Sequence, residues 1–240
     1  MTPNPVTFLQ HLQTMGYHPR SDKHSNALAE AIIGDLLKYC PKIATKAAAG
    51  QLVYDLNFTI TVGTANWNID LVIGSAPLGM KPPEPTIPIV KTPPALVQIA
   101  IEIKSVMTEH RKAVKNRKRD FDAHHAHVHQ YNPHAIAGGI LILNASPKFK
   151  SPLRPSETIH KNPDKLVLHC LDEFRGISSS GGTIGVAGLD AKAVVVVNCD
   201  NIDHPGTCYL TTKPAPVVGD PIHYDAFIQN ICDLYTARFP

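Results

Sequence analysis

The stretch Ala95–Ser105, ALVQIAIEIKS, decides the fold that this sequence predicts, because branched apolar residues recur in it at every second position, as in a β-strand. With a side-chain period of two, one face of the strand is apolar and the opposite face carries both charges. The apolar face consists of Val97, Ile99, Ile101 and Ile103, and the opposite face of Gln98, Ala100, Glu102 and Lys104. A carboxylate and an ammonium are costly to bury alone. Glu102 and Lys104 therefore need each other, water or a metal ion.

A third charged side chain stands in an apolar strand upstream. Leu52–Val62 and Trp67–Gly74 are rich in β-branched residues and are separated by the turn signal GTAN, which predicts a hairpin. Asp70 lies in the apolar centre of the second strand. If this strand is a neighbour of the strand described above, then Asp70, Glu102 and Lys104 converge at one end of a sheet.

The rest of the chain alternates between helical and strand patterns. Ser25–Cys40 has apolar residues at helical spacing, and Pro41 is expected to end this helix. A longer helix is expected from about Met107 to Tyr131. Further strands are predicted at Ala135–Ala145 and Ala191–Asn198, further helices at Asp164–Phe174 and Asp220–Phe239, and loops at the proline-rich Pro77–Pro94 and the glycine-rich Gly176–Gly188. This order predicts one α/β domain over residues 1–240, with a central mixed β-sheet flanked by α-helices.

Composition places the chain among globular proteins. Of its 240 residues 43% are apolar, which is enough for a substantial core. No apolar run approaches the ~18–20 residues of a membrane span, and the start of the chain does not have the pattern of a signal peptide. The five cysteines are scattered and form no C-x-x-C pair. We therefore expect a cytoplasmic protein without a disulfide framework or a membrane partner.

Positive charge is concentrated in one segment. Lys104–Arg119 contains seven Lys or Arg residues against the single acid Glu109, so it carries +6 while the whole chain carries only +3. Such a patch on a mildly acidic body suggests a polyanionic partner, and a solvated helix face is the alternative reading.

The charged residues of the strands and of this segment fit one chemistry. Two carboxylates on rigid strands make a hard oxygen site for Mg²⁺, which also binds substrate phosphate. A lysine beside them can orient the attacking water and neutralise charge on the phosphate. The basic segment that follows could neutralise the backbone of the same nucleic-acid substrate.

Together these residues resemble the PD-(D/E)XK nucleases, the superfamily of many type II restriction endonucleases. The match consists of Ile69-Asp70 on the second hairpin strand and Glu102-Ile103-Lys104 on the next strand. A helix precedes them, and a helix and a buried strand follow, so the resemblance covers roughly residues 25–145. Ile69 stands where the name of the motif has proline, and the proline-rich insert accounts for the long gap between the two acidic residues.

The resemblance implies a restriction-endonuclease-like fold and a set of roles. Asp70 and Glu102 would hold Mg²⁺, Ile103 can contribute its carbonyl, and Lys104 would assist the water. Some members add an acidic residue from the first helix, for which Glu30 is the first candidate; Asp35 is the second. The basic residues expected to contact the DNA backbone are Arg111, Lys112, Lys115, Lys118 and Arg119.

The predicted function is a Mg²⁺-dependent endonuclease acting on double-stranded DNA, a type II restriction enzyme working as a homodimer. Residues after about 146, including Lys148–Lys165, would supply recognition or dimer contacts. One alternative is a nuclease of the same fold in repair, junction cleavage or methylation-dependent defence. The other is a non-catalytic nucleic-acid-binding protein in which Glu102 and Lys104 form a structural ion pair.

Histidine and cysteine clusters offer weaker alternatives. His125 and His129 have the i, i+4 spacing of zinc ligands on a helix, but phosphate or base contacts suit them equally. Cys199, His204 and Cys208 do not have a fourth ligand or a standard zinc spacing, so simple packing is the preferred reading.

Overall fold

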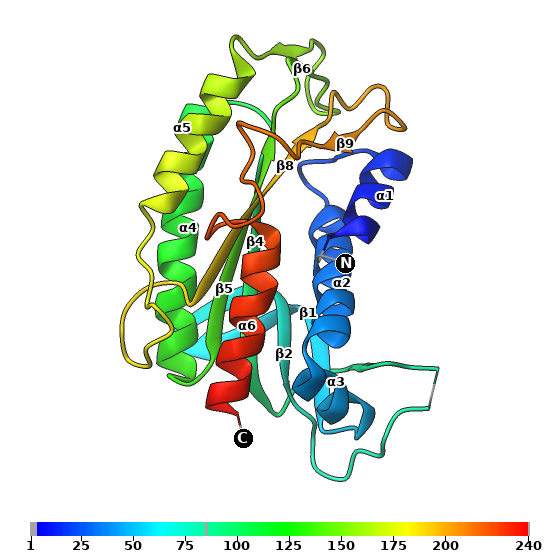
Figure 1. The fold of residues 1–240 in the computed structure, drawn as a ribbon, viewed down its shortest axis with the longest axis vertical. Helices are drawn as coiled ribbons and strands as arrows, with labels where there is room; N and C mark the ends of the chain where they lie inside the picture. Colours follow the sequence, from blue (N-terminus) through cyan, green and yellow to red (C-terminus); the bar gives the residue numbers. More distant parts are fainter. Residues whose placement is uncertain (1–3, 85, 240) are drawn as a thin grey trace.

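A computed structural model describes residues 4–84 and 86–239 as a three-layer arrangement, with a mixed seven-stranded sheet between two layers of helices (Figure 1). The strands are β1 (Leu52–Val62), β2 (Ala65–Ser75), β3 (Val90–Lys91), β4 (Leu96–Val106), β5 (Ile136–Asn144), β8 (Ala191–Asn198) and β9 (Cys208–Tyr209), with a separate pair β6 (Lys148–Phe149) and β7 (Thr158–Ile159). The helices are α1 (Val6–Met15), α2 (Lys23–Tyr39), α3 (Pro41–Ala48), α4 (His110–Tyr131), α5 (Pro163–Arg175) and α6 (Tyr224–Arg238). None of these helices is long and apolar enough to cross a membrane.

The strand order in the sheet is β3-β1-β2-β4-β5-β8-β9. The hairpin β1–β2 is antiparallel, β2 pairs antiparallel with β4, and β4, β5 and β8 are parallel. Parallel neighbours need a crossover connection, and α4 and α5 supply the two crossovers. The predicted mixed sheet flanked by helices is therefore confirmed.

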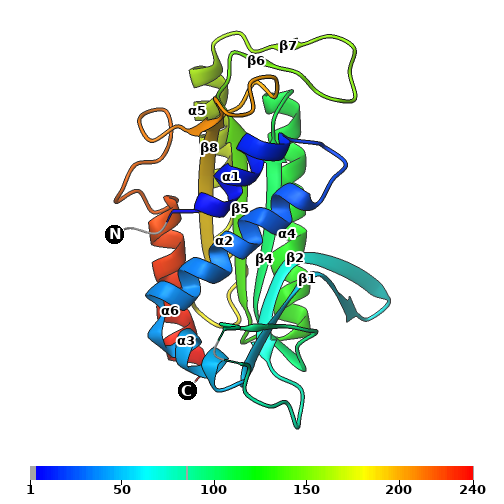
Figure 2. The ribbon, with the colours of Figure 1, turned by 90° about the vertical axis from the view of Figure 1, so that its right-hand side faces the viewer.

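Each face of the sheet has its own apolar core. On one face α1, α2, α3 and α6 pack onto the strands, with Leu28 and Phe227 fully buried. On the other face α4 and α5 cover the sheet, and Phe121 and Phe174 meet there edge to face with ring centroids 5.3 Å apart. Figure 2 views the molecule from the side of α1 and α2, so that these helices lie in front of the sheet and α4 behind it, with the β1–β2 hairpin extending past α4. Burial on both faces explains why β5 and β8 read as continuous apolar runs.

Most elements lie where the sequence predicts them. Pro41 is an exception in its role, because it is the first residue of α3 rather than only the end of the preceding helix; proline suits that position since its missing N–H needs no partner there. Helix α1 was not predicted, and it is anchored by the buried side chains Phe8 and Leu12. The proline-rich loop contains the two-residue strand β3, which pairs with β1 at the sheet edge.

The predicted alternation along β4 is wrong at its start. Val97 lies in the core beneath α4 and α5, whereas Ile99 lies in the opposite core. The reason is a bulge, since the register with β2 shifts by one residue after Ile73. Gly74 permits this close approach, because a Cβ atom there would stand 2.0 Å from the carbonyl oxygen of Leu96.

Candidate active site at the end of strands β2 and β4

Asp70, Glu102 and Lys104 converge as the sequence predicts. The β2–β4 ladder ends at the pair Leu71 and Ile101, so Asp70 and Glu102 occupy the next position beyond its end. The carboxylate of Asp70 takes the place of a strand partner, because its Oδ2 accepts the N–H of Ile103 at 2.7 Å. Lys104 forms an ion pair with Glu102, and its Nζ lies 3.8 Å from Asp70 Oδ2. One ammonium thus faces two carboxylates.

Burial perturbs all three charges. Glu102 is only 2% exposed, and burial, together with the charge of Asp70, raises its pKa to about 7 despite Lys104 nearby. Burial also raises the pKa of Asp70, opposed by Lys104 and by the hydrogen bond from Ile103. For Lys104, burial lowers the pKa, but the attraction of Glu102 and Asp70 outweighs it and the pKa is raised. Lys104 is therefore the permanent positive charge of the site, and Glu102 is its titrating acid.

His124 of α4 completes the surroundings of Glu102. Its Nε2 lies 3.2 Å from the carbonyl oxygen of Ala100, which can only accept, so Nε2 carries the proton. Its Nδ1 lies 3.8 Å from Glu102 Oε2, and both atoms are buried without a hydrogen-bond partner among the described residues. Burial lowers the pKa of His124 to about 3, so the ring is neutral. Glu102 thus has one oxygen on Lys104 and one facing a neutral imidazole.

A cavity of about 550 Å³ opens beside this cluster, between the α1–α2 loop, the first turn of α2, the end of β4 and the start of α4. Asp70, Ile103 and Lys104 line it, whereas Glu102 is buried and lies outside its lining. Phe149 and Ser151 of the following segment border the same space. The accessible wall therefore includes the carboxylate of Asp70, the ammonium of Lys104 and the β2-facing edge of β4 beyond the end of the β2–β4 ladder.

Helix α2 brings Asp22 to this cavity, and Glu30 and Asp35 lie elsewhere. Asp22, the residue before the first turn of α2, lines the cavity together with Ser25, and its charge is one of the influences that raise the pKa of Asp70. Glu30 and Asp35 line a different cavity, where Asp35 accepts a hydrogen bond from the hydroxyl of Tyr224. Glu30 and Asp35 therefore do not lie at the site where an acidic residue of this helix was expected, because only the start of α2 reaches the end of β4.

Helix α4 presents one stripe of residues to the site. Ala113 and Arg117 line the cavity, Asp120 pairs with Arg117 at 3.0 Å, and His124 reaches Glu102. Spacings of four, three and four residues place these side chains on one side of the helix. Arg117 belongs to the basic segment but not to the predicted DNA-contacting set. Its i, i+4 relation to Ala113 does not reveal from the sequence alone that this side of the helix faces the cavity.

The predicted DNA-contacting residues divide between two sides of α4. Arg111, Lys115 and Lys118 follow one another at spacings of four and three, about 140–200° around the helix from Ala113, so they face away from the cavity. Lys118 is directed to the α5 end, next to Gly176. Lys112 and Arg119 are exposed and lie between the two stripes.

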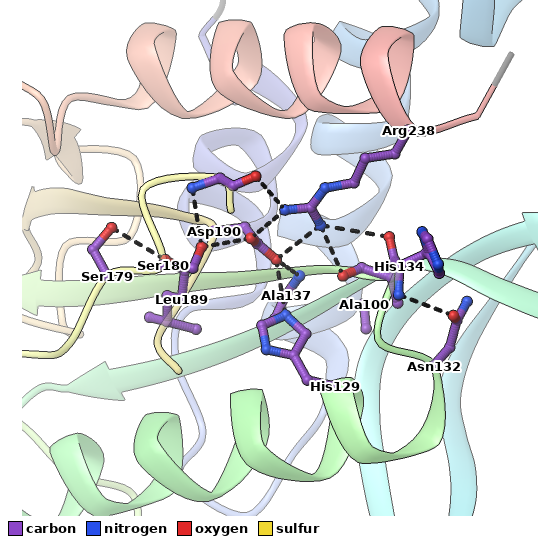
Figure 3. A network of polar contacts seen from close by, with 12 residues as sticks. Ala100, His129, Asn132, His134, Ala137, Ser179, Ser180, Leu189, Asp190 and Arg238 are labelled. Carbon is purple, nitrogen blue, oxygen red and sulfur yellow. Dashed lines mark hydrogen bonds and ion pairs between the residues drawn. The ribbon is translucent and has the colours of Figure 1, made fainter. Parts of the chain in front are cut away.

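The histidine-rich end of α4 serves a different purpose. His129 Nε2 lies 3.0 Å from the buried carboxylate of Asp190, which also binds Arg238 and the hydroxyl of Ser180 (Figure 3). His125 contacts His129 with ring centroids 6.3 Å apart. Across residues 4–84 and 86–239 no three His, Cys, Asp or Glu residues are grouped as metal ligands. The network joins α4, β5, the glycine-rich loop and α6, and it stands apart from the cavity lining.

No family model, curated protein or solved structure matches this chain.

Proposed function

We propose that this protein is a Mg²⁺-dependent endonuclease of the PD-(D/E)XK type that hydrolyses phosphodiester bonds in double-stranded DNA. The observation that carries the proposal is the meeting of Asp70, Glu102 and Lys104 at the ends of two adjacent strands, with one ammonium against both carboxylates. The order helix, hairpin, strand, helix, strand formed by α2, β1, β2, β4, α4 and β5 supports it, because this is the order on which the family resemblance rests.

The donor atoms suit a hard divalent cation. Asp70 and Glu102 supply carboxylate oxygens, and Glu102 Oε2 has no hydrogen-bond partner among the described residues. In a strand the N–H and C=O of one residue point to the same side, so the carbonyl of Ile103 faces the side of Asp70. These residues would hold Mg²⁺, which supplies Lewis-acid activation of water and of the phosphate when bound. Binding needs Glu102 to release Lys104 and turn its carboxylate to the cavity.

Lys104 then has the role of a mobile cation. Glu102 and Asp70 raise the pKa of Lys104 by more than burial lowers it. Lys104 therefore stays protonated at neutral pH. Released from Glu102, the ammonium can hold the attacking water and neutralise charge that develops on the phosphate. Arg117, which lines the same cavity, can bind a neighbouring phosphate oxygen.

The surroundings suggest how duplex DNA would be held. Lys112 and Arg119 are exposed on α4 between the cavity stripe and the opposite stripe, so they can contact backbone phosphates. Phe149 and Ser151 of the segment 148–165 line the cavity, which supports a part for this segment in recognition. We propose a sequence-specific type II restriction enzyme acting as a homodimer as the specific form of this activity.

The test is cleavage of unmodified phage-length DNA with Mg²⁺ and with EDTA by the wild type and by Asp70→Asn, Glu102→Gln and Lys104→Met. Lys91→Met, an exposed lysine on the edge strand β3, is the matched control. We expect discrete fragments from the wild type and from the control, and a loss of at least about 100-fold in the three site variants. Equal cleavage by Glu102→Gln would contradict the proposed site.

A non-catalytic DNA-binding protein is the second candidate, favoured by the burial of Glu102 away from the cavity wall. It predicts Mg²⁺-independent binding of DNA without cleavage of unmodified, methylated or branched DNA. Cleavage confined to methylated or branched DNA would instead indicate the repair or defence variants of the same fold.

A further inference from the structure

Asn57 interrupts β1 directly across from Asp70. It has a left-handed backbone with φ of 54° in the middle of an 11-residue strand. The β1–β2 ladder pairs Leu56 with Leu71 and Phe58 with Ile69, so the register is kept while the pair between them, Asn57 and Asp70, is omitted. Asparagine tolerates this conformation better than most residues, because its short polar side chain can bond locally.

At this interruption the side chains of both strands change the face of the sheet on which they lie. Leu56 and Leu71 belong to the core beneath α2, whereas Phe58 and Ile69 belong to the core beneath α4. The outer half of the hairpin therefore packs against α4, where the ring of Trp67 from β2 lies 5.0 Å from that of His127. Asn57 and Asp70 sit at the turning point, at the level where the β2–β4 ladder also ends.

The carboxamide of Asn57 reaches the start of α2. Its Nδ2 lies 3.2 Å from Asp22 Oδ2 and 3.2 Å from Asn26 Oδ1. A carboxylate can only accept, so the Asn57 amide donates to Asp22. The carbonyl of Asn57 is fixed in turn, because it accepts from Asn68 Nδ2 at 2.9 Å. Asn57 thus links the irregular point of β1 to the acidic residue that α2 brings to the cavity.

Holding Asp22 there has a physical cost. Asp22 and Asp70 line the same cavity, and like charges that share a site repel. In the absence of a fixed donor, Asp22 would be free to turn toward solvent. A donated amide hydrogen keeps the carboxylate beside Asp70 without adding charge.

We infer that Asn57 is a positioning residue for the cation-binding carboxylates, acting by holding Asp22 beside Asp70. This inference rests on the proposed function. The irregular point of β1 thus keeps a second carboxylate, that of Asp22, at the cavity together with Asp70. Asn57 itself touches neither substrate nor cation in this scheme.

The test measures binding of Mn²⁺, as a spectroscopic substitute for Mg²⁺, to the full chain without DNA, by electron paramagnetic resonance. Asn57→Gly keeps the left-handed backbone accessible and removes the side chain that donates to Asp22 and Asn26. We expect it to weaken Mn²⁺ binding about 10-fold, as for other residues that orient metal ligands. Asn66→Ala, on the exposed part of the same hairpin, is the matched control and should bind as the wild type does.

A double-mutant cycle identifies the route. If Asn57 acts through Asp22, Asn57→Gly has no further effect in the Asp22→Asn background. Equal Mn²⁺ affinity of Asn57→Gly and wild type, or an undiminished effect in that background, would overturn the inference and leave the proposed function standing. A wild type that binds no Mn²⁺ would overturn the proposed function and the inference with it. A thermal unfolding midpoint for each variant separates this effect from a loss of folding.

Discussion

Asp70 accepts the backbone N–H of Ile103 at the point where β2 ceases to pair with β4. The carboxylate therefore does two things at once: it satisfies a strand-end donor and it faces the ammonium of Lys104. A structural role and a chemical role in one side chain can be separated by the choice of substitution.

Asp70→Asn should keep the fold and lose the activity. The amide oxygen can still accept from Ile103, and removing a largely buried charge relieves its desolvation, so the free energy of unfolding should stay within about 1 kcal/mol of wild type. Asp70→Ala leaves the N–H of Ile103 without its acceptor and should lose about 1–3 kcal/mol. Urea unfolding in EDTA measures both, and DNA cleavage should be absent in both. Equal destabilisation by the two variants would show that the hydrogen bond is not the structural contribution.

Glu102 should make the metal-free protein less stable as the pH rises from about 4.5 to about 7. Its pKa is raised from 4.5 to about 7, first by burial and then by Asp70, so in this interval the folded state binds a proton that the unfolded state has lost. The stabilisation is fully present below the unfolded pKa, and its loss amounts to about 3 kcal/mol. Urea unfolding of wild type and Glu102→Gln in EDTA at several pH values measures it. Glu102→Gln should not show this loss of stability with rising pH. Parallel plots of unfolding free energy against pH for the two proteins would contradict the prediction.

The sequence predicted the parts of the site that depend on strand periodicity. Glu102 and Lys104 are visible because charges in an apolar strand violate a local pattern, and Asp70 is visible for the same reason. Asp22 is not visible in this way, because an acid before a helix is ordinary capping chemistry. Its importance arises from tertiary structure, since the start of α2 happens to lie at the end of β4.

Backbone irregularities also limited the prediction of side-chain positions from the sequence. The left-handed backbone at Asn57 and the bulge at Gly74 change the face of the sheet on which the following side chains lie. Neither irregularity alters the apolar pattern of the sequence enough to be recognised. Val97 was assigned to the wrong core for this reason. A period-two prediction holds only between such points, because one inserted residue reverses every assignment beyond it.

The salt dependence of DNA binding should distinguish the cavity-lining and solvent-exposed residues of α4 from those turned toward α5. Each lost phosphate contact lowers the slope of log affinity against log salt by about 0.9 for duplex DNA. Arg117→Ala and Lys112→Ala should each show this reduction, whereas Lys118→Ala should not, since Lys118 is turned to the α5 side next to Gly176. Binding to a fixed duplex in Ca²⁺, titrated with KCl, is the measurement. A reduced slope for Lys118→Ala would place the DNA on the other side of the helix.

Breaking the Asp190–Arg238 pair should cost more stability than breaking an exposed ion pair. Both side chains are almost completely buried, at 0% and 4% exposed. Burial raises the pKa of Asp190, but hydrogen bonds from His129, Arg238 and Ser180 outweigh it and hold the pKa well below its usual range. Removing Arg238 leaves a buried carboxylate short of donors, so Arg238→Met should lower the free energy of unfolding by about 3–5 kcal/mol.

The matched control is Arg175→Met, which breaks the half-exposed pair of Arg175 with Asp220 and should cost less than about 1 kcal/mol. Because the folded pKa of Asp190 is depressed, its contribution is fully present above the unfolded value near 4 and is lost progressively as the pH falls from there toward the folded pKa. Urea unfolding at pH 7 and pH 3 therefore provides a second check, since the difference between wild type and Arg238→Met should shrink at the lower pH. Equal costs for the two arginines at pH 7 would mean that the network joining α6 to the sheet (Figure 3) does not stabilise the fold in this way.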